Sequence, residues 1–271
     1  MPELPEVETI RRTLEPHLLG QVVGRVDLLT PSVWRGEEPG AAAGQRITAL
    51  DRRGKHLLIF LGDARPMVLH THLGMTGRLI FVPPGEPGPG RHVHAVFSLD
   101  RGDLYYQDQR RFGYLELLAA DAVDAHPRLR LGPEPLDGDF TATVLAGMLS
   151  GRRAPVKAVL LDQHILAGVG NIYADEALHR AGVHPLRPAG ELSRAEVGAL
   201  RDALQEVLAE AISARGTTFS DYRDGDGQPG EFVFRLRVYG REGEPCPRCG
   251  APVARQRLGG RSTCFCPRCQ R

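Results

Sequence analysis

The first nine residues of the chain, M-P-E-L-P-E-V-E-T, place an imino acid beside three carboxylates. Removal of the initiator methionine, which is usual before a small residue, would leave Pro2 as a secondary amine. An α-amino group has a pKa of about 8, below that of lysine, so more of it is nucleophilic at pH 7. A secondary amine condenses with the aldehyde form of a sugar to give an iminium cation. Pro2 is therefore a candidate nucleophile.

The neighbouring carboxylates are Glu3, Glu6 and Glu8, and Pro5 is expected to open a helix over residues 6–17. Carboxylates at this position can hold the amine, protonate a leaving oxygen or complement the positive end of the helix. A frayed terminus with solvated glutamates is the alternative interpretation.

Few other amines compete with the N-terminus. Of the 34 basic residues only Lys55 and Lys157 are lysines, so a Schiff base has three candidate amines in all. The basic charge is also unevenly distributed. Residues 235–271 hold nine arginines and two glutamates, a formal charge of +7, whereas the rest of the chain holds 25 bases and 31 acids, a charge of −6. A basic segment on an acidic body favours a polyanionic partner.

The chain has no apolar run of the roughly 18 residues that a membrane span requires, and no basic-then-apolar signal at its start. We therefore expect a cytoplasmic protein. Its 271 residues suffice for two or three compact units with substantial cores.

Four cysteines near the C-terminus form a C-x2-C…C-x2-C array with sixteen residues between the pairs: Cys246, Cys249, Cys266 and Cys269. Four thiolates at this spacing match a tetrahedral structural zinc site, which leaves no open position for catalysis. Two disulfides are the alternative, which a cytoplasmic location disfavours.

The residues between the two cysteine pairs predict a β-hairpin over residues 251–265 that carries Arg255, Arg257 and Arg261. A fifth cysteine, Cys264, lies within this predicted hairpin. It is a free thiol, and nothing in the sequence assigns it a role.

The N-terminal half of the chain reads as strands with short connections, which is typical of a β-sandwich or flattened barrel. The predicted strands cover residues 21–29, 46–53, 56–61, 67–73, 78–82, 94–99, 103–107 and 113–118. Residues 83–90, P-P-G-E-P-G-P-G, are expected to form a loop.

The pattern becomes helical after residue 140. The predicted helices cover residues 140–149, 156–163, 173–181 and 193–214, and the last opens with a capping-box signature, Ser193 to Glu196. The glycine-containing turn Q-H-I-L-A-G-V-G-N before the third helix could cradle a phosphate. Residues 216–230 are polar and rich in glycine, and could form a mobile loop over a site.

Several strings in this order make the chain resemble bacterial formamidopyrimidine-DNA glycosylase. They are P-E-L-P-E-V-E-T, R-R-G-K-H-L-L, H-L-G-M-T-G-R-L, Q-R-R-F-G, G-V-G-N-I-Y-A, V-Y-G-R-E-G-E-P-C-P-R-C-G and R-S-T-C-F-C-P-R-C-Q. The resemblance covers essentially the whole chain. It implies an α+β multidomain fold with DNA in the cleft between the halves. The expected domains are an N-terminal β-sandwich catalytic domain (1–132), a helical helix–two-turns–helix DNA-binding domain (133–234) and a C-terminal zinc-finger β-hairpin (235–271).

The resemblance also implies catalytic roles. Pro2 matches the nucleophile that attacks the anomeric carbon, and Glu3 matches the general acid that helps to open the sugar ring. Lys55 matches a proton donor in β-elimination, and Arg261 matches an arginine tied to δ-elimination and phosphate binding. From the residues alone, Lys55 could equally be only a phosphate contact.

The same resemblance implies DNA contacts. Met75, Arg110 and Phe112 match the trio that fills the hole left by an extruded base and contacts the orphaned cytosine. A thioether and an aromatic wedge suit that void. Without the resemblance, Met75 and Phe112 would be assigned to the core. Arg110 could equally form an ordinary solvated pair with Arg111.

Backbone contacts are implied for His92, Arg152 and Asn171, and residues 216–222 match the loop that closes over the flipped base. Taken alone, His92 could be a plain surface histidine and Asn171 a helix N-cap.

The chain departs from its relatives in places that bear on selectivity. Gln109 stands where many relatives have proline, and Thr76 follows Met75 at a variable position. Phe219 and Ser220 lie in a loop that varies in the family.

The resulting hypothesis is a monomeric, bifunctional base-excision-repair enzyme with one structural Zn²⁺ ion that acts on damaged double-stranded DNA of the bacterial nucleoid. It would remove 8-oxoguanine and formamidopyrimidines through a Schiff base on Pro2, then cleave the strand by β,δ-elimination without catalytic magnesium. One alternative is an endonuclease VIII-like glycosylase for oxidised pyrimidines, although P-E-L-P-E favours the purine branch over P-E-G-P-E. Another is a non-catalytic zinc-finger DNA-binding protein, which would need neither Pro2 nor Glu3.

Overall fold

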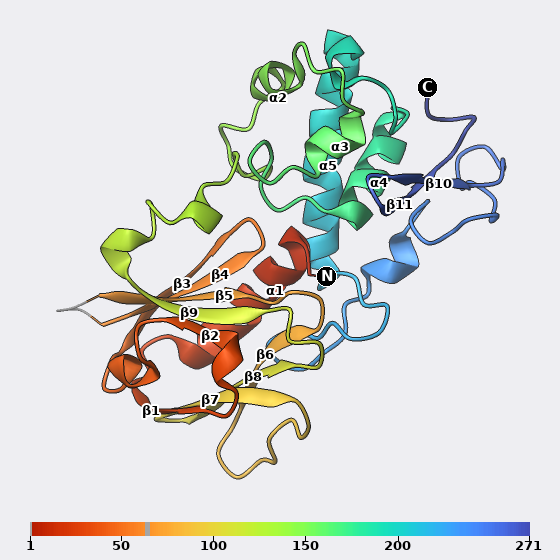
Figure 1. The fold of residues 1–271 in the computed structure, drawn as a ribbon. Coiled ribbons are helices and arrows are strands. Elements are labelled where there is room, and N and C mark those ends of the chain that lie inside the picture. Colours follow the sequence, from red (N-terminus) through yellow and green to blue (C-terminus); the bar gives the residue numbers. More distant parts are fainter. Residues whose placement is uncertain (1, 63–65) are drawn as a thin grey trace. The chain divides into compact units, whose positions relative to one another are not determined.

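The structure, a computed structural model, describes residues 2–62 and 66–271 (Figure 1). The chain forms two compact units, Met1–Arg130 with Ala214–Glu231, and Leu131–Ser213 with Phe232–Arg271. The second domain expected from the sequence, residues 133–234, includes Ala214–Glu231, which the structure groups with the first unit. The reason is a set of hydrogen bonds between this segment and the first helix.

That first helix, α1 (Leu4–Leu18), confirms the helix predicted at the N-terminus and begins two residues earlier than expected. Glu3 is its N-cap, and Pro5 lies in its first turn, where a missing N–H costs no hydrogen bond. Val7, Ile10 and Leu14 recur at helical spacing and are buried in the core of the first unit.

Two sheets pack around this core and confirm the predicted β-sandwich. The four-stranded sheet has the order β1 (Val23–Leu28), β7 (Val93–Leu99), β8 (Gly102–Asp108) and β6 (Gly77–Val82). The five-stranded sheet has the order β2 (Trp34–Gly36), β9 (Tyr114–Ala119), β5 (Met67–His72), β4 (His56–Leu61) and β3 (Ile47–Arg53). All eight predicted strands are present. The sequence missed β2, which pairs in parallel with β9.

Alternation along β4, β5 and β9 separates the two faces of the five-stranded sheet. Leu57, Leu69 and Leu115 point into the main core. Leu58 and Val68 point to the other face, where they pack against a small apolar cluster from the segment that follows β9. We call this second side the outer face.

The second unit contains four helices among the described residues, as predicted: α2 (Ala142–Leu149), α3 (Val156–Leu160), α4 (Asn171–Ala181) and α5 (Arg194–Ser213). The capping box of α5 is confirmed, because Ser193 N–H donates to Glu196 Oε2 (2.8 Å) and Glu196 N–H donates to Ser193 Oγ (3.3 Å). The helix α3 is shorter than predicted, since the chain turns at Asp162, whose carbonyl accepts from Ile165 and Leu166 N–H.

The predicted hairpin is also confirmed. Strands β10 (Ala254–Leu258) and β11 (Arg261–Phe265) are joined by Gly259 and Gly260, which both have positive φ as a tight two-residue hairpin requires. The hairpin lies beside α4 (Figure 1).

Short 3₁₀ helices complete the described chain: η1 (Pro31–Val33), η2 (Pro39–Ala42), η3 (Ala120–Ala122), η4 (Pro127–Leu129), η5 (Ala189–Glu191) and η6 (Phe232–Arg235). Over residues 2–62 and 66–271, no helix combines the length and apolar character that crossing a membrane would demand.

Candidate functional site

From Pro2 onward, the N-terminal segment is fixed in the fold rather than frayed. Pro2 is buried, and Glu3 is only 3% exposed. Glu3 and Glu6 form a reciprocal capping box, in which Glu3 N–H donates to Glu6 Oε2 (2.8 Å). The alternative of solvated glutamates at a loose terminus is therefore wrong.

Glu8 is committed to a structural role. Its carboxylate accepts from Arg11 (3.0 Å), Arg12 (2.6 Å) and Arg52 (3.3 Å). Burial acts to raise the pKa of Glu8, but the hydrogen bonds from Arg11 and Arg12 and the nearby charges outweigh it and hold the pKa below its ordinary value. Glu8 is thus an ionised anchor.

Arg52 extends this anchor to the turn that carries Lys55. While its Nε atom donates to Glu8, its Nη1 atom donates to the carbonyl of Gly54 (3.0 Å). Gly54 has a φ of 58°, and with Lys55 it forms the two-residue turn between β3 and β4. The helix that starts behind Pro2 therefore helps to fix the backbone of Lys55, whose side chain is buried.

Glu6 also holds the segment that matches the closing loop. Its Oε1 atom accepts from Thr217 N–H (2.7 Å), and its backbone carbonyl accepts from Tyr222 Oη (3.2 Å). Burial, together with the charges of Glu6 and Asp224, raises the pKa of Tyr222, which keeps the phenol protonated as a donor. Further along, Gly225 N–H donates to Thr13 Oγ1 (2.9 Å).

Asp108, at the end of β8, organises the two turns that carry the predicted wedge. It is fully buried and accepts from Thr76 Oγ1, from Arg110 N–H (3.2 Å) and from Gly113 N–H (2.9 Å). Gly74 lies so close to the second turn that an added Cβ would meet Gly113 N at 2.5 Å. The sequence reasoning missed Asp108, although it stands within the Q-D-Q-R-R-F-G run.

These turns carry the three wedge residues, Met75, Arg110 and Phe112. Met75 is 43% and Phe112 is 57% exposed, so the alternative that they are core residues is wrong. The guanidinium of Arg110 lies 4.6 Å from the ring centroid of Phe112, a cation–π distance. The structure thus brings this trio together on one surface of the first unit.

A polar hollow of about 200 Å³ adjoins the trio. It is lined by Thr76, Arg78, His92, Gln107, Gln109 and Asp221. His92 is exposed with a φ of 66°, and its carbonyl accepts from Asp108 N–H (3.0 Å). Thr76 and Gln109, two positions that the sequence analysis links to selectivity, therefore share one hollow.

In the second unit, the structure brings Asn171 next to the turn of the zinc hairpin. Asn171 is the first residue of α4 and not its N-cap, which is Gly170. Its Nδ2 atom donates to the carbonyl of Ser262 (2.9 Å), which follows the exposed Arg261. The preceding turn is held by Gln163, whose side chain accepts from Gly168 N–H (2.9 Å) and donates to the Val169 carbonyl (2.8 Å).

Lys157 belongs to the same region but is completely buried. Its Nζ atom lies 2.7 Å from Asp175 Oδ1 and donates to Ser262 O (3.0 Å) and Thr263 Oγ1 (2.9 Å). Burial raises the pKa of Asp175, while the charge of Lys157 opposes that rise. Lys157 is therefore a structural cation that fixes β11.

Arg152 follows α2 in the chain, whereas Asn171 begins α4. It is exposed, and its Nε atom donates to the Met148 carbonyl (2.6 Å). Of the predicted site residues, the first unit holds Pro2, Glu3, Lys55, Met75, His92, Arg110 and Phe112, and the second unit holds Arg152, Asn171, Arg261 and the four cysteines of the zinc array.

The cysteine array has the geometry of a closed zinc site. The sulfur atoms of Cys246, Cys249, Cys266 and Cys269 all lie within 4.8 Å of one another, and two of their separations are 4.0 and 3.5 Å. Zn–S bonds of about 2.3 Å in a tetrahedron would place the sulfurs about 3.8 Å apart. The four thiolates therefore fit one structural zinc ion.

Cys264 is buried and lies outside this ligand set. Its N–H donates to Asp175 Oδ2 (2.9 Å). Glu176 supports the segment before the array by accepting from Arg237 N–H (2.9 Å), Val238 N–H (2.9 Å) and Tyr239 N–H (2.8 Å).

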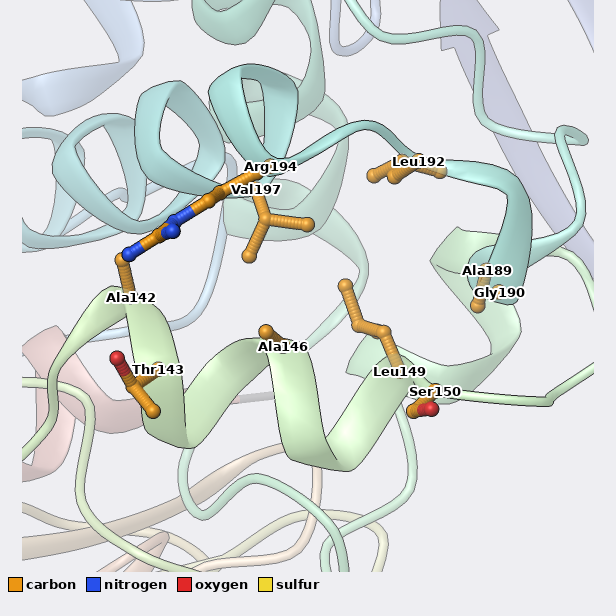
Figure 2. A pocket seen from close by; sticks show the side chains of 10 residues that line it. All are labelled: Ala142, Thr143, Ala146, Leu149, Ser150, Ala189, Gly190, Leu192, Arg194 and Val197. Carbon is orange, nitrogen blue, oxygen red and sulfur yellow. The ribbon is translucent and has the colours of Figure 1, made fainter.

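A larger groove of about 420 Å³ lies elsewhere in the second unit, between α2 and the start of α5 (Figure 2). Ala146 and Leu149 of α2 face Val197 of α5 across it. None of the predicted site residues lines this groove. The volume of a pocket is therefore not a guide to the functional site in this protein.

Three family models match the chain in order. They are the formamidopyrimidine-DNA glycosylase N-terminal domain (residues 1–115), its H2TH domain (131–223) and the zinc finger found in FPG and IleRS (243–271). The chain belongs to the formamidopyrimidine-DNA glycosylase family. The resemblance inferred from the motifs and the predicted fold class are confirmed.

Relatives in this glycosylase family cover the full length. The formamidopyrimidine-DNA glycosylase of Moorella thermoacetica is 54% identical, with 95% of both chains covered. The MutM (Fpg) protein of Thermus thermophilus is 48% identical with a TM-score of 0.89, over 99% of this chain and 98% of that one. A Lactococcus lactis Fpg mutant in complex with DNA containing Fapy-dG is 35% identical with a TM-score of 0.92, over 100% of both chains.

Proposed function

We propose that this glycosylase removes oxidised purines from duplex DNA and then cleaves the strand by β,δ-elimination from a Schiff base on Pro2. The protein is a DNA glycosylase of base excision repair, and AP lyase activity accompanies glycosylase activity in its family. The observation that carries the proposal is the N-terminus. The buried Glu3 directly follows Pro2, whereas Glu6 holds Thr217 and Glu8 holds arginines of the first unit.

The proposed chemistry assigns separate roles to this pair. The Pro2 nitrogen attacks C1′ of the damaged nucleotide as the bond to the base breaks, and the proton lost from the Pro2 nitrogen neutralises the departing base. Glu3 donates a proton to the ring oxygen as the sugar opens, which leaves an iminium between Pro2 and C1′. The iminium withdraws electrons, so a proton leaves C2′ and the C3′–O3′ bond breaks. Loss of a second proton then breaks the C5′–O5′ bond.

Lys55 is the candidate donor of a proton during the first elimination. Its turn is fixed by Arg52, which is itself held by Glu8. Lys157 is excluded as a competing amine, because it is fully buried against Asp175. The three candidate amines of the chain thereby reduce to Pro2 and Lys55.

The exposed trio is proposed to replace the extruded base. Phe112 and Met75 are exposed enough to enter a stack, and Arg110 is oriented by its contact with the Phe112 ring. Extrusion costs a few kcal/mol, which contacts of this kind offset.

Phosphate contacts are proposed for His92 in the first unit and for Arg152, Asn171 and Arg261 in the second. An amide nitrogen carries two hydrogens, so Asn171 retains one for a phosphate oxygen after bonding Ser262. Arg261 is exposed at the hairpin turn. The protein is proposed to act as a monomer on nucleoid DNA in the cytoplasm, with the three expected domains at 1–132, 133–234 and 235–271.

Oxidised pyrimidines are a second candidate substrate. The wild-type Lactococcus lactis Fpg protein, 35% identical to this chain, has been solved with DNA containing an oxidised pyrimidine. The polar hollow beside Thr76 and Gln109 has no apolar residue in its lining, so it does not by itself select one ring type.

The test is borohydride trapping on a duplex with one 8-oxoguanine opposite cytosine, followed by peptide mapping of the cross-link. An adduct on Pro2 is the expected result. An adduct on Lys55 would keep the glycosylase and overturn the nucleophile. A parallel duplex with thymine glycol reports the pyrimidine alternative, and binding to both duplexes without adduct or cleavage would leave a non-catalytic DNA-binding protein.

A further inference from the structure

A cluster of histidines on the outer face of the five-stranded sheet has no part in the proposed reaction. His70 of β5 stands directly opposite Glu116 of β9 in the antiparallel register. His126 reaches the same point from the segment after β9, where it is the N-cap of η4. The three residues come from separate parts of the first unit and converge on one carboxylate.

The distances within this cluster are those of a ligand set. Glu116 Oε2 lies 3.2 Å from His70 Nδ1 and 3.5 Å from His126 Nε2. All three atoms fall within 4.8 Å of one another. Bonds of about 2.1 Å to a tetrahedral ion would place neighbouring ligand atoms about 3.4 Å apart.

We propose that His70, Glu116 and His126 bind one divalent transition-metal ion, for which zinc is the best match. Two imidazoles and one carboxylate are a recurring zinc set, and imidazole favours such ions over magnesium or calcium. Three protein ligands leave a fourth position for water. The side chains of His126 and Glu116 are 14% and 12% exposed, so an ion and its water can reach the site from solvent.

A further histidine orients the buried ligand. His70 Nε2 lies 2.8 Å from His56 Nδ1 on the adjacent strand β4. When His70 Nδ1 binds a metal, its Nε2 atom carries the proton and donates it to His56 Nδ1. Hydrogen bonding of the second ring nitrogen is what usually fixes a metal-binding histidine.

Arg128 is the group that competes with a metal for Glu116. Its Nη1 atom lies 3.6 Å from Glu116 Oε2, and its side chain is 49% exposed. The guanidinium can therefore move toward solvent when an ion takes the carboxylate. It keeps a second contact, 4.9 Å from the centroid of the Tyr114 ring.

The ion would tie the segment after β9 to the sheet. Val123 and Leu129 of that segment already pack on Leu58 and Val68 of the outer face. His126 lies between them in the sequence. Metal–ligand bonds would reinforce this small apolar contact, just before the chain leaves the first unit after Arg130.

The test uses the full-length, zinc-loaded protein dialysed against excess Zn²⁺ and then against metal-free buffer, with metal counted by mass spectrometry. Wild type is expected to retain two ions per chain. Glu116→Gln and His126→Gln should retain one, and should lose the rise in thermal midpoint that added Zn²⁺ gives wild type. His17→Gln is the matched control, because His17 forms a histidine–carboxylate pair with Asp226 in the same unit without a third ligand.

Cobalt substitution identifies where the second ion sits. Thiolate charge-transfer absorption marks the cysteine array, whereas an ion at the histidine site adds ligand-field absorption without further thiolate charge transfer. This added absorption should persist in His17→Gln and vanish in His126→Gln. His126 lies outside the sheet, in the segment after β9, so His126→Gln tests the site if Glu116→Gln unfolds. One ion in wild type, or two ions in both ligand variants, would overturn the proposal.

Discussion

At the scale of single residues, Asp108 shows how one buried carboxylate can position a surface trio. It holds Thr76 in one turn and Arg110 and Gly113 in the other. Asp108→Asn would put an amide N–H₂ where N–H donors converge, so at least one donor loses its acceptor. We expect a loss of about 1–3 kcal/mol in the free energy of unfolding, measured by urea titration.

Excision should fall as well, because Arg110 and Phe112 lose their fixed backbone. Asp103→Asn is the control, since Asp103 lies at the opposite end of β8 and bonds only Tyr105 among the contacts described. Normal single-turnover excision by Asp108→Asn would contradict the positioning role.

Phe112, unlike Asp108, is exposed, so we expect its side chain to stabilise the complex with DNA and not the folded protein. Phe112→Ala should change the free energy of unfolding by no more than about 0.5 kcal/mol. Binding to a duplex with an abasic-site analogue should weaken by about 1–3 kcal/mol, the usual value of a stacking contact. Leu29→Ala, at an equally exposed apolar side chain of the same unit, is the control. Equal affinity of the Phe112 and Leu29 variants would remove Phe112 from the wedge.

At the scale of elements, the start of α5 depends on Glu196. Hydrogen bonds from Arg187, and then from Ser193 N–H, lower the pKa of Glu196 to about 2 from an ordinary 4.5. A carboxylate whose pKa is lower in the folded than in the unfolded protein stabilises the fold above pH 4.5. This contribution is lost as the pH falls through 4.5 toward 2. Because the side chain is 34% exposed, solvent screening limits the effect to about 1 kcal/mol.

Glu196→Gln should therefore lower the thermal midpoint at pH 7, and the difference from wild type should shrink as the pH approaches 3. Glu206→Gln changes an exposed carboxylate on the same helix and should have the smaller effect at pH 7. A difference that stays constant down to pH 3 would assign the loss to packing instead of charge.

Elements with a clear period could be predicted from sequence. Helix α1 buries residues at spacings of three and four, and β4 follows its predicted bounds, residues 56–61. Strand β2 could not be predicted, because three residues are too few to show alternation and its pairing with β9 is distant in sequence. The attachment of residues 214–231 to the first helix could not be predicted for a similar reason, since its contacts with Glu6 and Thr13 join residues about 210 positions apart.

The candidate site shows the same limit. The spacing of the four cysteines was enough to predict the zinc site, and a local motif singles out Pro2 and Glu3 as candidates. The pairing of His70 with Glu116 depends on the register between β5 and β9, which the sequence alone does not show. Asp108 could not be singled out, because an aspartate at a strand end is an ordinary feature until the donors that converge on it are seen.

At the scale of the whole molecule, the positive charge of residues 235–271 depends on the zinc site for its placement. The core of the C-terminal segment consists of Val238, Val253 and three cysteines, of which Cys246 and Cys266 are zinc ligands. So small a core cannot fold without its metal. The nine arginines of residues 235–271 therefore depend on zinc for their placement.

Cys249→Ser removes one zinc ligand and should disorder this segment while the first unit keeps its sheets. Each phosphate contact contributes about −0.9 to the slope of log K against log salt concentration. We expect the variant to bind undamaged duplex more weakly and with a shallower slope, measured by fluorescence anisotropy over a range of salt concentrations. Cys264→Ser, a buried cysteine of the same segment outside the ligand set, should keep both the zinc and the wild-type slope. An unchanged slope in Cys249→Ser would mean that the basic segment contributes no ordered phosphate contacts.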